Sequence, residues 1–270
     1  MFRKMLSGAQ RFVRGHVVRL GALRRLSTRY CIENRLLPSL ITRTPSANVR
    51  EMLGLPASEY CPQLNQDIFA LLMNQFRPGV FLEIGANDGF TVSNTVYLEE
   101  EFGWSGILVE ANPKYLATLA RRRRSAVVNK AVASQAGKAE FLDAGLHGGL
   151  KDRIDDAHRV HRKDAPTITV DCAGLQEILD DVDAPARIDF VSIDVEGGEV
   201  PIVEQMVSGA RRFRCGCIER NQRAADYQRI VTLLTESGYN VVWEGQTGHD
   251  LFFVDTHVSE GAPLNVVGSP

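Results

Sequence analysis

The sequence lacks several features that would assign it to a specialised class of protein. None of its apolar runs approaches the roughly 18 residues that a membrane-spanning helix requires. Its five cysteines are odd in number, unevenly spaced and without a Cys-x-x-Cys pair. That pattern excludes a disulfide framework and a cysteine zinc site, and it predicts reduced thiols in a cytoplasmic protein. The 270 residues are 44% hydrophobic and 24% charged, which is typical of one large globular domain with an extension.

Charge is distributed unevenly along the chain. The net charge is −2, yet residues 1–50 hold eleven Lys and Arg and a single acidic residue, Glu33. Residues 1–29 place apolar side chains on one side of a helical wheel and most basic ones on the other, which predicts a basic amphipathic helix. Three hypotheses fit such an arm: peripheral contact with the inner face of an anionic membrane, an organelle transit segment, or docking on an acidic domain or a second subunit.

The organisation into domains follows from this arm and from the prolines after it. Residues 37–62 carry four prolines, which predicts a linker or an irregular lid. We therefore expect a basic arm and proline-containing linker over residues 1–60, a folded domain over 61–257 and a flexible tail over 258–270.

The stretch from Val80 to Gly89 is the centre of the predicted domain. An apolar run, residues 80–84, suits a strand buried on both faces, and a loop with Gly85 and Gly89 follows it. An amphipathic stretch, residues 93–101, predicts the next helix. This succession opens a doubly wound α/β domain, which binds ligands at the carboxyl ends of its strands.

The loop also restricts the ligand. The pyrophosphate-binding pattern G-x-G-x-x-G is absent, because Asn87 stands where its second glycine would be. Glu83 and Asp88 flank the turn and would repel a pyrophosphate, whereas they suit a cationic ligand such as S-adenosylmethionine (SAM). Glu110 ends the next apolar run, 21 residues after Gly89, near the offset of a ribose-binding carboxylate.

Apolar runs and amphipathic stretches alternate through the rest of the domain. Strands are expected at 80–84, 106–110, 126–129, 188–193, 214–218, 239–243 and 251–254. Helices are expected at 67–76, 93–101, 113–123, 175–180, 200–207 and 226–237. Alternation predicts a parallel sheet, and the short gap before the last strand predicts a terminal antiparallel hairpin.

Four blocks in this order resemble the FkbM family of SAM-dependent methyltransferases. They are residues 81–89 (FLEIGANDG), 109–113 (VEANP), 129–132 (NKAV) and 189–199 (DFVSIDVEGGE). The resemblance covers roughly residues 64 to 255. It implies a class I methyltransferase fold, a mostly parallel seven-stranded sheet with helices on both faces, SAM as cofactor, and O-methylation of sugars or other small-molecule or glycan hydroxyls.

The resemblance also implies roles for residues in the first three blocks. Glu83 and the turn, which contains Gly85, Ala86, Asn87 and Gly89, would line the methionine part of SAM. Glu110 would bind the ribose hydroxyls. Asn129 and Lys130, at the end of the third strand, would lie near the adenine.

Asp194 and Glu196 close the strand of the fourth block, so we expect both at the carboxyl edge of the sheet. A carboxylate whose pKa is raised by a like-charged neighbour suits a general base for a hydroxyl acceptor. The pair could instead hold Mg²⁺, or be structural, with Asp194 on SAM and Glu196 capping the next helix. Glu219, at another strand end, and His147, in the polar stretch 144–166, are candidate acceptor contacts. The histidines have no metal-binding spacing.

Two other functions compete with an O-methyltransferase that takes a small-molecule or glycan acceptor. One is a nicotinamide-dependent oxidoreductase, which the acidic loop disfavours. The other is a membrane-attached, non-catalytic SAM-fold interaction module, which would bind through the arm. A nucleic-acid acceptor is disfavoured, because the domain is acidic and has no Asn-Pro-Pro-aromatic motif.

Overall fold

The computed structural model describes residues 41–60, 62–154, 159–220, 223–244 and 247–257. The predicted basic helix of residues 1–29 and the predicted tail of residues 258–270 lie outside this part of the chain.

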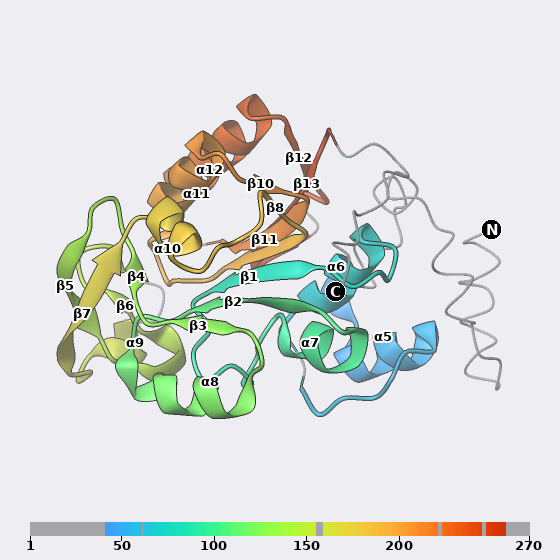
Figure 1. Ribbon diagram of the computed structural model, residues 1–270, viewed down its shortest axis with the longest axis horizontal. Coiled ribbons are helices and arrows are strands. Elements are labelled where there is room, and N and C mark those ends of the chain that lie inside the picture. Colours follow the sequence, from blue (N-terminus) through green and yellow to red (C-terminus); the bar gives the residue numbers. More distant parts are fainter. Residues whose placement is uncertain (1–40, 61, 155–158, 221–222, 245–246, 258–270) are drawn as a thin grey trace.

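A seven-stranded, mostly parallel sheet forms the centre of the molecule (Figure 1). The strand order is β12-β13-β11-β9-β1-β2-β3, and β13 alone runs antiparallel to its neighbours. This order is that of a class I methyltransferase fold and confirms the predicted parallel sheet with its terminal hairpin. The strands are β1 (Val80–Ile84), β2 (Ser105–Val109), β3 (Ala126–Val128), β9 (Phe190–Ile193), β11 (Cys215–Glu219), β12 (Tyr239–Val242) and β13 (Asp250–Asp255).

Helices cover both faces of this sheet, because its inner strands are apolar on both sides (Figure 1). In β1, Phe81 faces one core cluster, whereas Leu82 and Ile84 face the other. One face is covered by α5 (Ser46–Leu53), α6 (Gln66–Met73), α7 (Val96–Phe102) and α8 (Leu116–Arg122), which follows the short 3₁₀ helix η1 (Pro113–Tyr115). The other face is covered by α10 (Leu175–Asp181), α11 (Glu199–Ser208) and α12 (Ala224–Glu236).

The described part of the predicted linker, residues 41–60, packs as part of the core. It forms α5, whose Val49 and Leu53 are buried together with Ile41. Arg50 is 1% exposed and pairs with Asp67 of α6, with Nη2 and Oδ2 2.6 Å apart. The prediction of a linker or irregular lid is therefore wrong for this segment, because its apolar side chains complete one face of the sheet.

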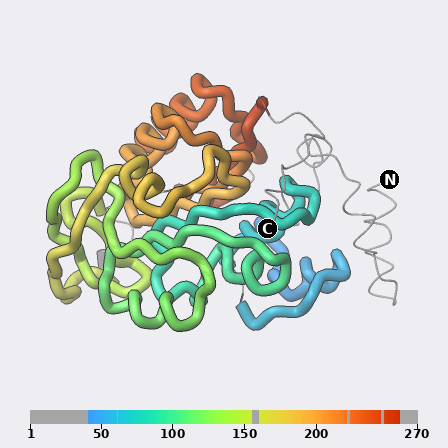
Figure 2. Tube along the Cα trace, in the orientation of Figure 1, coloured from blue at the N-terminus to red at the C-terminus, as the bar shows by residue number. Residues whose placement is uncertain are grey.

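Two smaller sheets were not predicted. One has the order β4-β7-β5-β6 and, with η2 and α9, lies to one side of the main sheet (Figure 2). Its parts are β4 (Ala131–Val132), β5 (Gly137–Leu142), η2 (Gly145–His147), β6 (Gly149–Leu150), α9 (Arg159–Arg162) and β7 (Thr167–Ala173). The other pairs β8 (Arg187–Ile188) with β10 (Arg212–Phe213). Residues 145–150, in η2 and β6, line the same cavity as Asp194 and Glu219 at the carboxyl ends of main strands.

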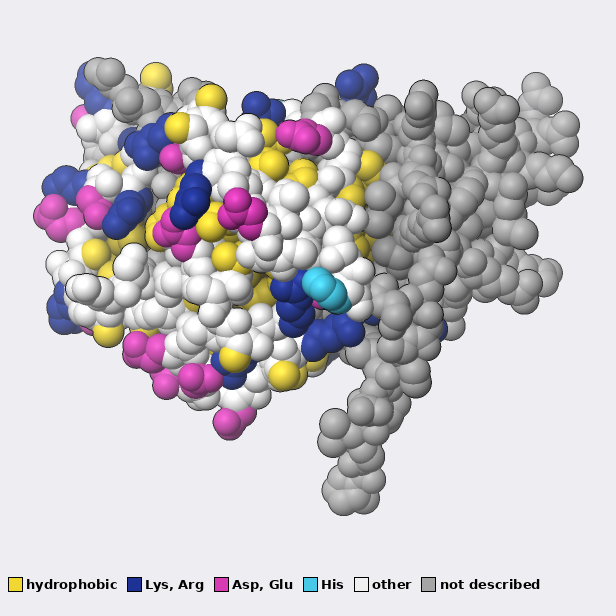
Figure 3. Space-filling view, turned by 90° about the horizontal axis from the view of Figure 1, so that it is seen from above, with side chains coloured by type: hydrophobic (Ala, Val, Ile, Leu, Met, Phe, Trp, Pro, Cys, Tyr) yellow, Lys and Arg dark blue, Asp and Glu magenta, His cyan; other side chains and the backbone are white. Residues whose placement is uncertain are grey.

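On the face seen in Figure 3, Lys and Arg side chains are interspersed with Asp and Glu. Among the described residues, none of the helices is long and apolar enough to cross a membrane.

Candidate active site

The loop after β1 touches the end of β9 so closely that only glycine fits. Gly85 has φ +90°, and a Cβ built on it would lie 1.8 Å from the carbonyl oxygen of Asp194. Gly89 has φ +79°, and its Cβ would lie 2.5 Å from the side chain of Leu119. Both positions therefore require glycine for space and for backbone conformation. The close approach forms the crevice between β1 and β9, where the strand order reverses.

Glu110 joins the end of β2 to this loop. Its Oε2 accepts a hydrogen bond from the backbone N–H of Asn87 at 2.7 Å, and its Oε1 accepts one from the N–H of Asn112 at 2.6 Å. Burial raises the pKa of the Glu110 carboxyl. Two backbone donors thus hold the carboxylate in one orientation at the wall of the crevice, where the ribose contact is expected.

Glu83 also lies at the crevice, but its carboxylate already accepts hydrogen bonds from other groups of the protein. It accepts hydrogen bonds from the Ser93 hydroxyl, the Asn94 backbone N–H at 2.8 Å and the Thr95 hydroxyl at 2.6 Å. The guanidinium of Arg123 lies 3.8 Å away, and burial still raises the pKa of Glu83. These contacts fix the segment before α7. Glu83 therefore shapes the wall where the methionine part of SAM is expected.

Asp88 holds the glycine loop in its turn. Its Oδ1 accepts hydrogen bonds from the backbone N–H groups of Phe90 and Thr91, at 2.9 and 2.8 Å. The side chain of Asp88 is thus satisfied within the loop, as in an Asx turn.

Asn129 and Lys130 follow the end of β3, and only Lys130 of the two lines the cavity. The Asn129 amide donates to the carbonyl oxygens of Glu110 and Ala111, at 2.7 and 3.1 Å, and so joins β3 to β2. Lys130 lines the cavity, while its ammonium group lies 3.0 Å from Asp181 of α10. The predicted adenine contact by these two residues stays a prediction.

One cavity of about 860 Å³ is lined by Glu83, residues 85–87, Glu110 and Lys130. Its volume lies in the upper part of the ~300–1,000 Å³ range of small-molecule and cofactor sites. Residues at the carboxyl ends of β9 and β11 line the same cavity. Leu146 and Leu150 from the small sheet also line it, as does Leu64 before α6. The cavity is therefore large enough for a cofactor together with a second molecule.

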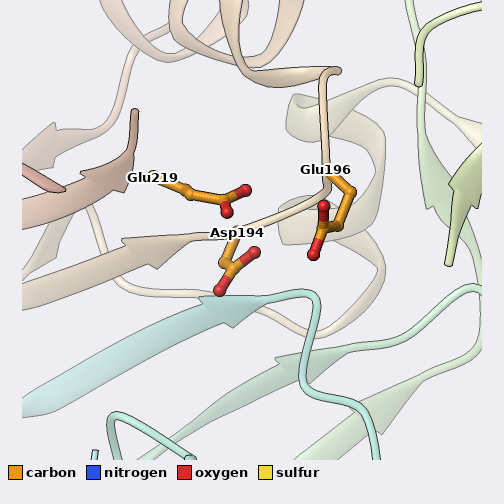
Figure 4. A group of neighbouring side chains, drawn as sticks. All are labelled: Asp194, Glu196 and Glu219. Atoms are coloured by element: carbon orange, nitrogen blue, oxygen red, sulfur yellow. The ribbon is translucent and has the colours of Figure 1, made fainter. Parts of the chain in front are cut away.

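Three carboxylates that line this cavity converge (Figure 4). One oxygen from each of Asp194, Glu196 and Glu219 lies within 4.8 Å of the others. Burial raises the pKa of Asp194, and the charge of Glu83 raises it further. Burial also raises the pKa of Glu219 well above its usual range, and the neighbouring Asp194 adds to this shift. The structure thus brings Asp194 and Glu196 together at this edge, with Glu219 beside them, and their catalytic role stays a prediction.

Glu196 differs from the other two because it has a cationic partner. The Arg162 guanidinium lies 2.5 Å from Glu196 Oε2, and the His147 ring Nδ1 lies 3.4 Å from Oε1. Arg162 Nε also donates to the carbonyl oxygen of His147 at 2.8 Å. Sequence reasoning missed Arg162, whose only signal was its place in the polar stretch 144–166. The alternative that Glu196 caps α11 is wrong, because the N-cap residue of that helix is Gly198.

These carboxylates fit Mg²⁺ poorly. Arg162 already neutralises Glu196, and the raised pKa of Glu219 favours its protonated form. Carboxylate ligands bind metal in the deprotonated form. Asp194 alone is then left as an anionic ligand without a cationic partner among the described residues.

The comparison with protein families gives one match. The model of the methyltransferase FkbM domain matches residues 83–241, which is more than half of the chain. Among curated proteins, no match was found.

Several solved structures align with this chain at TM-scores below 0.5. Precorrin-6y C5,15-methyltransferase from Geobacter metallireducens is 13% identical, with 73% of this chain and 90% of that chain covered and a TM-score of 0.39. Methyltransferase FkbM from Methylobacillus flagellatus is 11% identical, with 81% of this chain and 57% of that chain covered and a TM-score of 0.39. The fibrillarin pre-rRNA processing protein from Methanococcus jannaschii is 15% identical, with 66% of each chain covered and a TM-score of 0.37.

Proposed function

This chain belongs to the FkbM methyltransferase family, and from that premise we propose that it methylates a hydroxyl group of a sugar, glycan or other small molecule. SAM is the methyl donor that family membership implies. The observation that carries the proposal is the placement of Asp194, a carboxylate without a cationic partner among the described residues, in the same cavity as the glycine loop and directly beside Gly85.

The residues around the glycine loop suit SAM. Glu110 would accept hydrogen bonds from the ribose hydroxyls, because each of its oxygens keeps a lone pair after bonding to Asn87 and Asn112. Residues 85–87 and the wall at Glu83 would bind the methionine part, and Lys130 would border the adenine. Bound there, SAM supplies an electrophilic methyl group on a positively charged sulfur. The acidic crevice favours that charge.

Asp194 is the proposed general base. An alcohol has a pKa far above 7, so its proton must leave as its oxygen attacks, and a carboxylate of raised pKa is suited to take it. Glu196 is a weaker candidate, because Arg162 at 2.5 Å stabilises its ionised form. We therefore assign proton removal to Asp194 and acceptor orientation to Glu196 and His147.

The walls of the cavity favour a neutral polyhydroxyl acceptor. Glu196, Glu219 and His147 line the cavity together with Arg220 and His249, and such groups pair well with hydroxyls. Acidic side chains would repel a phosphate, and nucleic-acid binding depends on neutralising phosphates with Lys and Arg. A nucleic-acid acceptor is therefore disfavoured by the acidic charge of the site, as it was by the acidic charge of the domain in the sequence.

The test is transfer of a labelled methyl group. The purified protein is incubated with labelled SAM and separated pools of glycans, small metabolites, lipids, RNA and protein, with a chelator in half of the samples. We expect label in the glycan or small-molecule pool, attached through an ether oxygen and unaffected by chelation. Label in RNA or protein would overturn the acceptor class, and chelator-sensitive transfer would restore the metal hypothesis. SAM binding without transfer to any pool would favour a non-catalytic module.

A further inference from the structure

We propose that Glu219 is a positioning residue that keeps its proton and donates it in a hydrogen bond to Asp194, so that the two side chains share one negative charge. The inference rests on the proposed function, because Asp194 is the base that Glu219 would orient. It adds a role for Glu219 that the acceptor contact expected from the sequence does not include.

Strand register brings the two side chains together. Strands β9 and β11 are parallel neighbours in which Ile193 is paired with Ile218. Asp194 directly follows β9 and Glu219 is the last residue of β11, so the two positions are neighbours across the strand pair. One carboxyl oxygen of each lies within 4.8 Å of the other, in the group of side chains that Figure 4 draws. Two ionised carboxylates can only accept hydrogen bonds, so a favourable contact requires that one of them keeps a proton.

No other donor in the described part of the chain satisfies the pair. Glu219 Oε2 is buried without a hydrogen-bond partner, and no ion pair of Asp194 or Glu219 with Lys, Arg or His occurs among the described residues. A proton on Glu219 would give this buried oxygen the contact that it lacks. The cost of leaving a buried polar atom unpaired, ~1–3 kcal/mol, favours that arrangement.

The groups that face the pair come from several elements, and most are acidic. Glu196 is paired with Arg162, Glu199 of α11 accepts from backbone N–H groups, and Asp250 of β13 accepts from the Gln66 amide. Glu83 of β1 faces Asp194. Arg220 and His249 line the same cavity. Because the carboxylates outnumber the cations, the local field favours retention of the shared proton, and the raised pKa of Glu219 agrees with this.

The shared proton matters for the charge balance of the reaction. When the acceptor oxygen attacks, an oxygen–carbon bond forms, and the carbon–sulfur bond of SAM breaks with its electron pair left on sulfur. The hydroxyl proton moves to Asp194. SAM loses its positive charge when it gives up the methyl group, and the carboxyl pair loses its one negative charge when it takes the proton. The net charge of the site therefore stays the same. The hydrogen bond from Glu219 would orient the other oxygen of Asp194 toward the acceptor.

The first test needs no acceptor. In ¹³C NMR with labelled Glu and Asp, the wild-type protein should show a carboxyl carbon that is still protonated at pH 7. That signal should be absent in Glu219→Gln and unchanged in the control Glu236→Gln, which alters an exposed carboxylate. The same signal surviving in Glu219→Gln, or no protonated Glu in the wild type, would overturn the proposal.

The second test uses the acceptor that the transfer assay identifies. Glu219→Gln retains a donor to Asp194, so kcat at pH 7 should stay within a few-fold of wild type, and the wild-type loss of activity at high pH should disappear. Glu219→Leu removes the donor and should lower kcat about 10- to 100-fold, the range for a lost hydrogen bond to a charged group. SAM affinity should change only a few-fold in either variant.

The two variants also separate this inference from the proposed function. Equal losses of kcat in Glu219→Gln and Glu219→Leu would overturn the shared-proton role. The same loss of activity at high pH in Glu219→Gln as in wild type would also overturn it. Either result would leave the proposed O-methyltransferase function intact. Absence of transfer by the wild-type protein would instead overturn the proposed function, and the NMR test would still decide the protonation of Glu219.

Discussion

Arg162 Nη2 and Glu196 Oε2 lie 2.5 Å apart, and this ion pair joins α9 to the loop that follows β9. Both side chains are largely buried, at 5% and 9% exposure. Glu196 has φ +63°, an uncommon conformation for a residue other than glycine. The pair therefore fixes a strained loop that lines the cavity.

Removing one partner of this pair should lower the free energy of unfolding more than removing both partners. Arg162→Met leaves the Glu196 carboxylate buried without its partner, a loss of ~3–5 kcal/mol in typical proteins. At ~2–4 °C per kcal/mol for a domain of this size, we expect the melting temperature to fall by roughly 6 °C or more. The double variant Arg162→Met/Glu196→Gln should recover part of this loss in thermal unfolding. Additive losses would show that the pair contributes no coupling.

Asp194→Asn should separate catalysis from donor binding. The substitution keeps the shape of the side chain and removes the proposed base, which typically costs ~10²–10⁴ in rate. We expect kcat to fall by that range while calorimetry gives a SAM affinity within a few-fold of wild type. Glu196→Gln should mainly raise the KM of the acceptor. Normal turnover by Asp194→Asn would mean that the base lies elsewhere, with His147 the next candidate.

Glu110 should carry much of the SAM affinity. A carboxylate that accepts from two ribose hydroxyls is typically worth ~1.5–3 kcal/mol, so Glu110→Ala should weaken SAM binding about ten- to a hundredfold. Glu110→Ala also removes the acceptor of the hydrogen bonds from the Asn87 and Asn112 backbone N–H groups. In Glu110→Gln, one side-chain oxygen remains to accept a hydrogen bond from them. Glu101→Ala, an exposed position at the end of α7, is the control. Unchanged calorimetric affinity in Glu110→Ala would exclude the ribose contact.

The main sheet could be predicted from the sequence because its strands are buried on both faces. Continuous apolar runs mark β1 and β2, and each predicted strand falls within two residues of the observed one. Strand β5 of the small sheet buries only Phe141 fully, and β4 and β6 have two residues each, so none of them leaves a clear pattern. Helix α5 was missed because prolines on either side of it suggested a linker.

The site could be predicted only where it lies on the predicted strands. The carboxyl ends of parallel strands meet at one edge, so Glu110, Asp194 and Glu219 could be expected together. The partnership of Arg162 with Glu196 spans 34 positions and depends on the fold of α9 and the small sheet. No local pattern encodes such a contact. Likewise, the hydrogen bonds that fix Glu83 depend on the loop before α7.

The basic arm should be separable from the domain at residue 41 and not at residue 64. A chain that starts at Ile41 keeps the buried Ile41, Val49, Leu53 and Leu55 and should retain its melting temperature and SAM affinity. A chain that starts at Leu64 loses these side chains, each worth ~1.5–3 kcal/mol when buried. It also leaves Asp67 without Arg50. We therefore expect it to melt far lower.

The shorter chain also tests the predicted membrane contact. Residues 1–40 contain most of the basic side chains of the arm, so the chain that starts at Ile41 should lose binding to anionic liposomes at low salt. The full-length protein on neutral liposomes is the control, because electrostatic attraction requires anionic lipid. Equal binding of both chains to anionic liposomes would exclude a membrane role for the arm.

Asp250 should make the protein less stable as the pH rises toward neutrality. Burial and the charge of Asp194 raise its pKa to about 7 in the folded protein, whereas an unfolded Asp titrates near ~3.9. Below pH 4 the carboxyl is protonated in both states. Between pH 4 and 7 only the unfolded state loses the proton. The free energy of unfolding therefore falls across that window, by up to about 4 kcal/mol, and levels off above it.

Asp250→Asn removes this dependence and can still accept the hydrogen bond that Gln66 donates at 2.7 Å. We expect the melting temperatures of the variant and the wild type to agree near pH 4 and to diverge toward pH 8, with the variant the more stable. Asp164→Asn, at an exposed position, should follow the wild type at every pH. A constant offset between Asp250→Asn and wild type from pH 4 to 8 would show that Asp250 is ionised in the folded protein throughout that range.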